Sequence, residues 1–145
     1  MQPSCLLDTD ILSEVFKGRD ATVVARAVAY QAEYGRLSTS AVTVMEVVKG
    51  MRRLQREQAL IRLLAAMEAC EVLTFEAHCA KIAGSIYGDL ERTGQPIGRA
   101  DVMIASIAVA NDRTLVTGNL RHYRRIVELG YELHLDNWRE TAARP

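Results

Sequence analysis

The chain has 145 residues and a formal net charge of zero, with 49% apolar and 25% charged residues. These proportions favour one folded domain with a hydrophobic core, and they exclude a largely disordered chain. The neutral charge also excludes an overall basic field of the kind that attracts nucleic acid. Lysine supplies only three of the 18 basic residues. The excess of arginine suits phosphate binding, and a GC-rich genome would explain it equally well.

The three cysteines, Cys5, Cys70 and Cys79, lack the spacing of metal ligands, so we expect reduced thiols in the core. The first thirty residues lack the basic and apolar regions of a signal peptide. No segment approaches the roughly 18 consecutive apolar residues of a membrane span. We therefore expect a soluble, cytoplasmic protein without a membrane partner.

The first predicted element is a buried strand over residues 5–7, which ends at two carboxylates, Asp8 and Asp10. Thr9 or Asp10 would cap the helix that is predicted over residues 11–17. In open α/β sheets, ligands bind at the carboxyl ends of the strands. Asp8 is therefore predicted to lie at a ligand-binding edge.

Further strands and helices alternate along the chain, and no hairpin signal joins two strands. This order predicts a parallel sheet with helices on both faces, in a single α/β domain of residues 1–138 followed by a frayed tail of residues 139–145. The remaining predicted helices are 20–34, 43–51, 54–69, 76–92, 101–110 and 120–129, and the remaining strands are 36–40, 71–75, 113–117 and 131–135.

Polar side chains recur where these strands end and helices begin. They are Asp8 after the first strand, Glu46 one turn into the helix after the second, Asp101 at the start of an almost wholly apolar helix, and Asn119 after the fourth strand. Each also has a structural explanation, because Thr43 and Glu46 fit a capping box and Asp101 fits either an N-cap or an acid that complements the helix dipole. One shared site at the sheet edge is more economical than four independent caps.

Carboxylates gathered in one cleft repel one another unless a cation lies between them. Mg²⁺ prefers oxygen ligands and commonly needs only one or two carboxylates, together with water and a substrate phosphate. A metal ion in such a site activates water and stabilises the charged transition state of phosphodiester hydrolysis. The placement of the acids therefore favours metal-assisted chemistry, and it does not by itself choose the substrate.

Four motifs, residues 6–12, 40–46 with Gly50, 100–105 and 115–119, together resemble those of the PIN-domain ribonucleases, in particular the VapC-type toxins of prokaryotic toxin–antitoxin pairs. The resemblance covers essentially the whole chain. It implies a five-stranded parallel sheet, dependence on Mg²⁺ or Mn²⁺, and RNA as the substrate. It also implies a homodimer and an inhibiting cognate antitoxin, a segment of which lies across the cleft.

The resemblance assigns the acidic triad of the family to Asp8, Glu46 and Asp101, which would be catalytic and would bind the metal directly or through water. On this hypothesis, Asp8→Asn, Glu46→Gln and Asp101→Asn each abolish activity and leave the fold intact. Loss of folding in all three variants would instead support the capping explanation.

Five more residues receive supporting roles from the resemblance. Thr9 and Thr117 match positions that could orient water or phosphate, and Asn119 falls where some members carry a fourth acid. Asp10 replaces an asparagine that is common in the family, and we interpret it as a helix cap. Arg99 is a candidate phosphate contact because of its position two residues before Asp101.

A haloacid-dehalogenase-like phosphatase is the competing enzyme, with Asp8 as nucleophile and Asp10 as general acid. Its pattern also needs a downstream lysine and a late acidic pair, whereas Lys81 lies within a predicted helix and no acidic pair follows it. A receiver-like signalling module would need a lysine after the last strand. A non-catalytic PIN-like module that binds RNA or a partner would be expected to have lost one of the acids.

Overall fold

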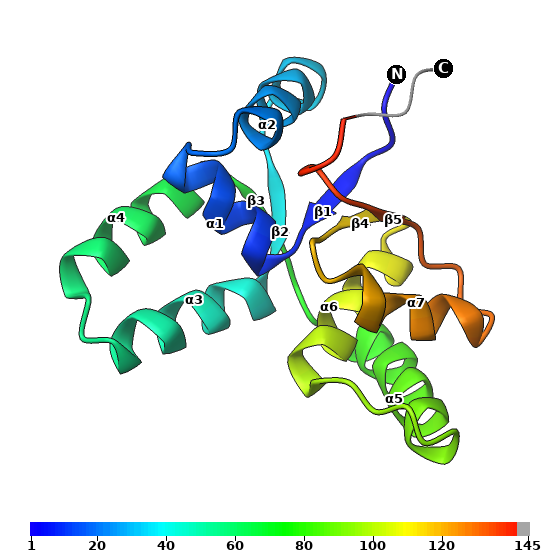
Figure 1. Cartoon of the computed structure of the whole chain (residues 1–145). Coiled ribbons are helices and arrows are strands. Elements are labelled where there is room, and N and C mark those ends of the chain that lie inside the picture. The colour runs from blue at the N-terminus through cyan, green and yellow to red at the C-terminus, as the bar shows by residue number, and fades with distance from the viewer. Residues whose placement is uncertain (142–145) are drawn as a thin grey trace.

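A computed structural model of the chain describes residues 1–141, which form short parallel strands separated by helices (Figure 1). The predicted α/β class is therefore confirmed. The elements in chain order are β1 (Cys5–Leu7), α1 (Thr9–Lys17), α2 (Ala21–Tyr34), β2 (Ser38–Ser40), α3 (Ala41–Arg53), α4 (Glu57–Met67), β3 (Glu71–Leu73), α5 (Ala77–Arg92), α6 (Arg99–Ala110), β4 (Thr114–Val116), α7 (Leu120–Glu128) and β5 (Leu135–Asp136).

The strands pair into two small parallel sheets. One has the order β1-β4-β5, with Leu6 opposite Leu115 and Leu115 opposite Leu135, and the other pairs β2 with β3. The prediction of parallel strands is confirmed, whereas the prediction of one continuous five-stranded sheet is wrong. Between β1 and β2, the Thr39 hydroxyl donates to the Leu7 carbonyl oxygen at 3.0 Å. The Thr39 side chain thus occupies the Leu7 carbonyl oxygen, which in a regular ladder would accept from a backbone amide.

Arg113, directly before β4, joins the two sheets at the amino ends of their strands. Its Nη2 donates to Glu71 Oε1 at 2.7 Å, and its Nη1 donates to Ser38 Oγ at 3.2 Å and to the Cys5 carbonyl oxygen at 3.4 Å. The side chains of Arg113 and Glu71 are only 19% and 27% exposed. One guanidinium therefore contacts the first residues of β1, β2 and β3.

Helices cover the strands from two sides, with α1 to α4 on one side and α5 to α7 on the other (Figure 1). Alternate residues of the strands supply the two hydrophobic cores, because successive side chains point to opposite faces. Leu7 and Val116 pack with the first group of helices, and Leu6 and Leu115 pack with the second. The predicted presence of helices on both faces is therefore confirmed.

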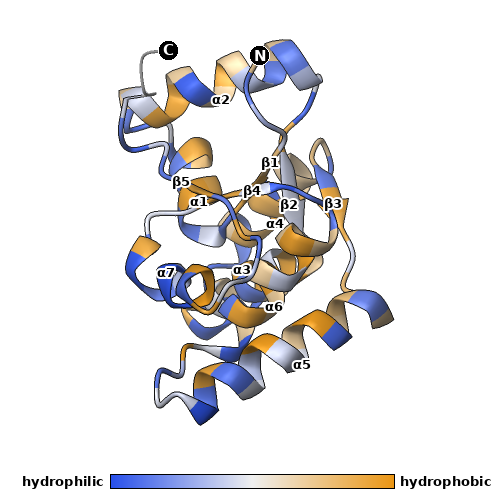
Figure 2. Cartoon of the chain, turned by 90° about the vertical axis from the view of Figure 1, so that its right-hand side faces the viewer, coloured by the Kyte–Doolittle hydropathy of each residue, from blue (hydrophilic) through white to orange (hydrophobic). Residues whose placement is uncertain are grey.

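Helix α6 runs through the second core, and its residues 104–108 are all buried. The sequence prediction of an internal apolar helix is thus confirmed. Helix α5 lies at the outside of the molecule, where Figure 2 shows hydrophobic and hydrophilic residues along the same helix. The first turn of α6, which carries Asp101, is consequently held on a rigid, packed element.

The last strand is shorter than predicted, because the amide of Leu133 donates to the carbonyl oxygen of Tyr131 at 2.9 Å. This turn keeps residues 131–134 out of β5. Beyond β5, Trp138 is fully buried and packs on Tyr30, with ring centroids 5.8 Å apart. The chain is thereby held against α2 as far as the predicted domain end.

The three cysteines are buried and free, as predicted. Within residues 1–141, no helix is long and apolar enough to cross a lipid bilayer.

Candidate active site

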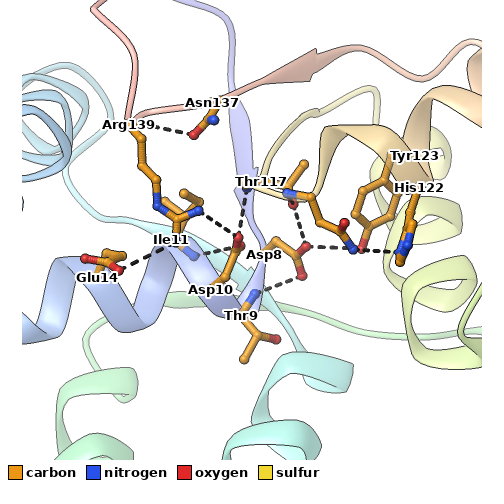
Figure 3. A network of polar contacts seen from close by, with 12 residues as sticks. Asp8, Thr9, Asp10, Ile11, Glu14, Thr117, His122, Tyr123, Asn137 and Arg139 are labelled. Carbon is orange, nitrogen blue, oxygen red and sulfur yellow. Dashed lines mark hydrogen bonds and ion pairs between the residues drawn. The ribbon is translucent and has the colours of Figure 1, made fainter.

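Asp8 occupies the point where β1 stops and α1 begins. It is the N-cap of α1, and its Oδ1 accepts a hydrogen bond from the Thr9 amide at 2.8 Å. The sequence prediction that Thr9 or Asp10 is the N-cap residue is therefore wrong, since the helix begins at Thr9. The Asp8 residue is 6% exposed, and its Oδ2 accepts from the Thr117 hydroxyl at 2.8 Å and lies 3.2 Å from Tyr123 Oη (Figure 3).

The environment of Asp8 disfavours its negative charge. Burial, above all, raises the pKa of Asp8 from 3.8 to about 6, and the charges of Asp10 and Asp101 act in the same direction. The hydrogen bonds from Thr117 and from the Thr9 amide oppose this rise. At neutral pH the group is therefore ionised, in a setting that a nearby cation would stabilise.

Asp101 lies in the first turn of α6, and its side chain is 24% exposed. The N-cap of this helix is Gly98, so the capping explanation for Asp101 is wrong. Its Oδ1 lies 3.3 Å from Tyr123 Oη, and its Oδ2 lies 3.8 Å from His122 Nδ1. The Tyr123 hydroxyl therefore lies between the carboxylates of Asp8 and Asp101. Burial and these two carboxylates hold the pKa of Tyr123 well above its usual value, so it remains a neutral donor.

Glu46 reaches the site through Thr9. Helix α3 begins at Ala41, and its cap is Ser40, whose hydroxyl accepts from the Thr43 amide at 3.1 Å. The capping box of Thr43 and Glu46 is therefore wrong, because Thr43 already lies within the helix. Instead, the Thr9 hydroxyl donates to Glu46 Oε1 at 2.7 Å. Glu46 is thus tied to the residue that directly follows Asp8.

The turn after β4 supplies a third side of the site. Thr117 is fully buried, and its hydroxyl both donates to Asp8 and accepts from the Asn119 amide at 3.0 Å. The Asn119 side chain does not point at an acid; its Nδ2 lies 2.9 Å from His122 Nδ1. Thr117 thus lies beside Asp8, and Asn119 contributes its backbone amide to Thr117 and its side chain to His122. The roles of Thr117 toward water or phosphate and of Asn119 toward a metal stay predictions.

Asp10 fastens the site to the C-terminal segment. Its Oδ2 accepts from the Gly118 amide at 2.9 Å and lies 3.4 Å from Arg139 Nη1, while Arg139 Nη2 lies 3.5 Å from Glu14 Oε1 (Figure 3). A Cβ atom at Gly118 would collide with the Arg139 guanidinium and lie 2.6 Å from Asp10 Oδ2. Asp8 and not Asp10 is the N-cap residue of α1, yet Asp10 Oδ1 accepts from the Ile11 amide at 2.8 Å in the first turn of that helix. The interpretation of Asp10 as a helix cap is therefore confirmed in part. The predicted tail of residues 139–145 starts with an anchored arginine, and residues 142–145 lie outside the described residues.

Arg99 is the first residue of α6, two residues before Asp101. It is exposed, and its guanidinium carbon lies 6.0 Å from the centre of the Tyr87 ring. Among the contacts of residues 1–141, no hydrogen bond or ion pair joins Arg99 to a carboxylate of the site. The phosphate contact that its position suggests stays a prediction.

Sequence reasoning missed two residues of the site, His122 and Tyr123. Tyr123 looked like one more apolar residue of a short amphipathic helix, because its spacing to Ile126 fits burial. The available signal was its place in the first turn after Asn119, where a hydroxyl on the buried face of α7 reaches the sheet edge.

The carboxylate oxygens at this edge of the sheet suit a hard divalent cation as ligands. Asp8 and Asp101 present carboxylate oxygens, which Mg²⁺ and Mn²⁺ prefer, and Mg²⁺ needs only one or two such ligands in addition to water and phosphate. The pKa of Asp8 is raised chiefly by burial and in smaller part by the charges of Asp10 and Asp101, and a nearby cation would favour the ionised form against both. Within residues 1–141, no group of three or more Asp, Glu, His or Cys side chains lies close enough together to hold a metal ion by itself. The arrangement fits a cation held by two carboxylates and completed by water or substrate.

Comparisons with known proteins point the same way. The model of the PIN domain family matches residues 5–128. The tRNA(fMet)-specific endonuclease VapC of Shigella flexneri is 32% identical over 122 residues, which cover 83% of this chain and 90% of that protein. Ribonuclease VapC2 of Rickettsia felis is 32% identical over 103 residues, which cover 70% of this chain and 74% of that protein.

Solved structures extend the likeness to the fold. VapBC2 from Rickettsia felis bound to a DNA fragment from its promoter has a TM-score of 0.77 and 26% identity, covering 92% of this chain and 97% of that chain. DNA-bound VapBC from Salmonella typhimurium has a TM-score of 0.75 and 28% identity, covering 94% and 99%. The family match spans all three acids that the sequence singled out. On the evidence of its sequence and its fold, the chain belongs to the PIN domain family.

Proposed function

We propose that the chain is a metal-dependent endoribonuclease that acts as the toxin of a type II toxin–antitoxin pair. One observation carries the proposal: the carboxylates of Asp8 and Asp101, from the end of β1 and the start of α6, lie within hydrogen-bonding distance of one buried hydroxyl. Relatives of this chain are named ribonucleases or endonucleases, which supports RNA as the substrate.

In this proposal, Asp8 and Asp101 bind Mg²⁺ or Mn²⁺, and Glu46 acts on it through water. The metal, when bound, lowers the pKa of a coordinated water and stabilises the negative charge that develops on the phosphate. The Thr9 amide and the Thr117 hydroxyl hold the two oxygens of Asp8 in place. Thr9 also fixes Glu46 Oε1, so that Glu46 Oε2 can accept a proton from the attacking water.

The partner proposed for this toxin is a cognate antitoxin. Structures of similar proteins from Rickettsia felis, Haemophilus influenzae and Salmonella typhimurium are VapBC assemblies, which supports such a partner. We further propose a homodimer that works in the cytoplasm, as the family resemblance implies.

A phosphatase of the haloacid-dehalogenase type fits the site less well. It would require Asp10 to act as a general acid, yet the Asp10 carboxylate is engaged by the Gly118 amide and by Arg139. Asp10→Asn is therefore expected to be mild for a nuclease and severe for a phosphatase.

Asp101→Asn is expected to abolish RNA cleavage, because the carboxylate charge at the start of α6 is lost. The test incubates purified protein with total cellular RNA and with initiator tRNA, in Mg²⁺, in Mn²⁺ and in EDTA. Initiator tRNA is included because a 32% identical relative is named for it. Asp112→Asn is the matched control, since Asp112 is exposed and its left-handed backbone (φ 50°) tolerates asparagine.

Discrete fragments that need metal, persist with the control and vanish with Asp101→Asn are the expected result. Turnover of p-nitrophenyl phosphate without any cleavage of RNA would overturn the proposal in favour of the phosphatase.

A further inference from the structure

Tyr123 is a buried aromatic residue whose polar end points at the candidate metal ligands. The residue is 0% exposed, and its Oη lies 3.2 Å from Asp8 Oδ2 and 3.3 Å from Asp101 Oδ1. A phenol hydroxyl in a core usually finds a hydrogen-bond partner. Here both partners are carboxylates of the site, so this hydroxyl connects the end of β1 with the start of α6.

The position of this hydroxyl is fixed by packing. The ring belongs to the core formed by α5, α6 and α7, together with Ile104, Leu115 and Ile126, all of which are 0% exposed. The start of α7 is held in turn by the bond from the Asn119 amide to Thr117 Oγ1 at 3.0 Å. The Tyr123 hydroxyl is therefore a donor at a fixed position, and a carboxylate must lie at that position to accept its hydrogen bond.

The two carboxylates depend on Tyr123 unequally. Asp8 keeps two other donors, the Thr9 amide and the Thr117 hydroxyl, both at 2.8 Å. For Asp101, Tyr123 is the only hydrogen-bond donor in the part of the chain that the structure describes, and His122 stands farther off at 3.8 Å. Without the phenol, repulsion from Asp8 would favour a turn of Asp101 away from the pair, opposed only by the longer contact to His122 among the contacts of residues 1–141.

We propose that Tyr123 is a positioning residue that holds Asp101 beside Asp8 and thereby prepares the pair to bind a divalent cation. This inference rests on the proposed function, because it concerns the same metal site. Outer residues that orient metal ligands typically contribute a factor of about 10 to 100 in metal affinity. A phenol with one proton can donate to only one carboxylate at a time. Asp8 already accepts from the Thr9 amide and the Thr117 hydroxyl, so Asp101 is the carboxylate that depends on the phenol.

Tyr123→Phe keeps the ring in the core and removes only Oη. We expect Mn²⁺ to bind about tenfold more weakly in isothermal titration calorimetry, and cleavage to recover at high Mn²⁺ concentration. Urea unfolding of the metal-free variant should show that the fold persists. Tyr131→Phe is the matched control, because it removes a phenol bond to the Asp89 carboxylate at 2.6 Å on residues outside the site.

A double-mutant cycle tests whether Tyr123 affects metal affinity through Asp101. If Tyr123 acts through Asp101, then Tyr123→Phe should change Mn²⁺ affinity little once Asp101→Asn is present. The inference is overturned if Tyr123→Phe binds Mn²⁺ as tightly as the wild-type protein, whatever happens to its activity. It is also overturned if the loss persists undiminished beside Asp101→Asn. A wild-type protein that neither binds Mn²⁺ nor cuts RNA would instead overturn the proposed function itself.

Discussion

Asp8→Asn is expected to reduce RNA cleavage by about a thousandfold or more, which corresponds to about 4 kcal/mol of transition-state stabilisation. At the same time, it should make the metal-free protein more stable at neutral pH. Asparagine caps helices as well as aspartate does, so the bond from the Thr9 amide can persist and the fold is kept. The charge that would bind a cation is lost, and with it the cost of burying that charge.

The pH dependence of this stability effect has a definite sign. Burial raises the pKa of Asp8 from 3.8 to about 6, so the folded chain holds a proton there more tightly than the unfolded chain. The free energy of unfolding should therefore fall as pH rises from about 4 to about 6, and then stay level as far as this group is concerned. The shift amounts to about 3 kcal/mol at most. Asparagine does not titrate, so the variant escapes this loss.

The measurement is urea unfolding in EDTA over this pH range, for the wild-type protein, for Asp8→Asn and for the exposed control Asp112→Asn. The stability difference between Asp8→Asn and the wild-type protein should grow from near zero at about pH 4 to about 1–3 kcal/mol at pH 7. A variant that is destabilised at every pH would contradict this expectation, and it would show that the second carboxylate oxygen is needed to accept from the Thr117 hydroxyl.

Arg113→Met is expected to lower the free energy of unfolding by about 3 kcal/mol, because it leaves the largely buried Glu71 carboxylate with only the exposed Arg36, whose Nη2 lies 3.8 Å from Glu71 Oε2. It also removes the donor that binds Ser38 Oγ and the Cys5 carbonyl oxygen. Since β1 and β2 share no backbone ladder, these contacts are a large part of what joins the two sheets. Methionine keeps most of the apolar stem of the arginine, so the loss reports mainly on the polar contacts.

The control for this prediction is Arg92→Met, whose exposed arginine pairs with Asp89 at 3.3 Å on the surface of α5. Exposed pairs contribute about 0.5 kcal/mol or less, so the control should unfold nearly as the wild-type protein does. Removing both charges with Arg113→Met and Glu71→Leu should restore part of the stability, because no buried charge is then left unpaired. Equal urea midpoints for Arg113→Met and Arg92→Met would contradict this account of how the sheets are joined.

The order of the elements and the edge at which the acids gather could be predicted from sequence, because both follow from local patterns. Hydrophobic periodicity located the strand before Asp8 and the internal helix after Asp101, and the carboxyl ends of parallel strands share an edge. The position of a cap could not be predicted to the residue. Asp8, Thr9 and Asp10 are all competent caps, as are Ser40 and Thr43, and only the path of the chain decides between them.

Several contacts of the site join residues that are far apart in the sequence, and no local sequence pattern predicts them. Tyr123 reaches Asp8, and Arg139 reaches Asp10, across more than 100 positions of sequence. The gap between β1 and β2 likewise depends on where the Thr39 hydroxyl falls relative to the Leu7 carbonyl oxygen. Each of these depends on how elements pack in three dimensions, and a single sequence does not encode such pairings in a readable pattern.

The central claim is that Asp8 and Asp101 together bind a divalent cation. The measurement that tests it most directly is anomalous diffraction from crystals of the full chain soaked in MnCl₂, beside crystals of the Asp101→Asn variant. The account predicts one manganese peak bonded to carboxylate oxygens of Asp8 and Asp101, which loses most of its height in the variant. Well-ordered wild-type crystals with no peak at these carboxylates, or with a peak that survives Asp101→Asn unchanged, would contradict it.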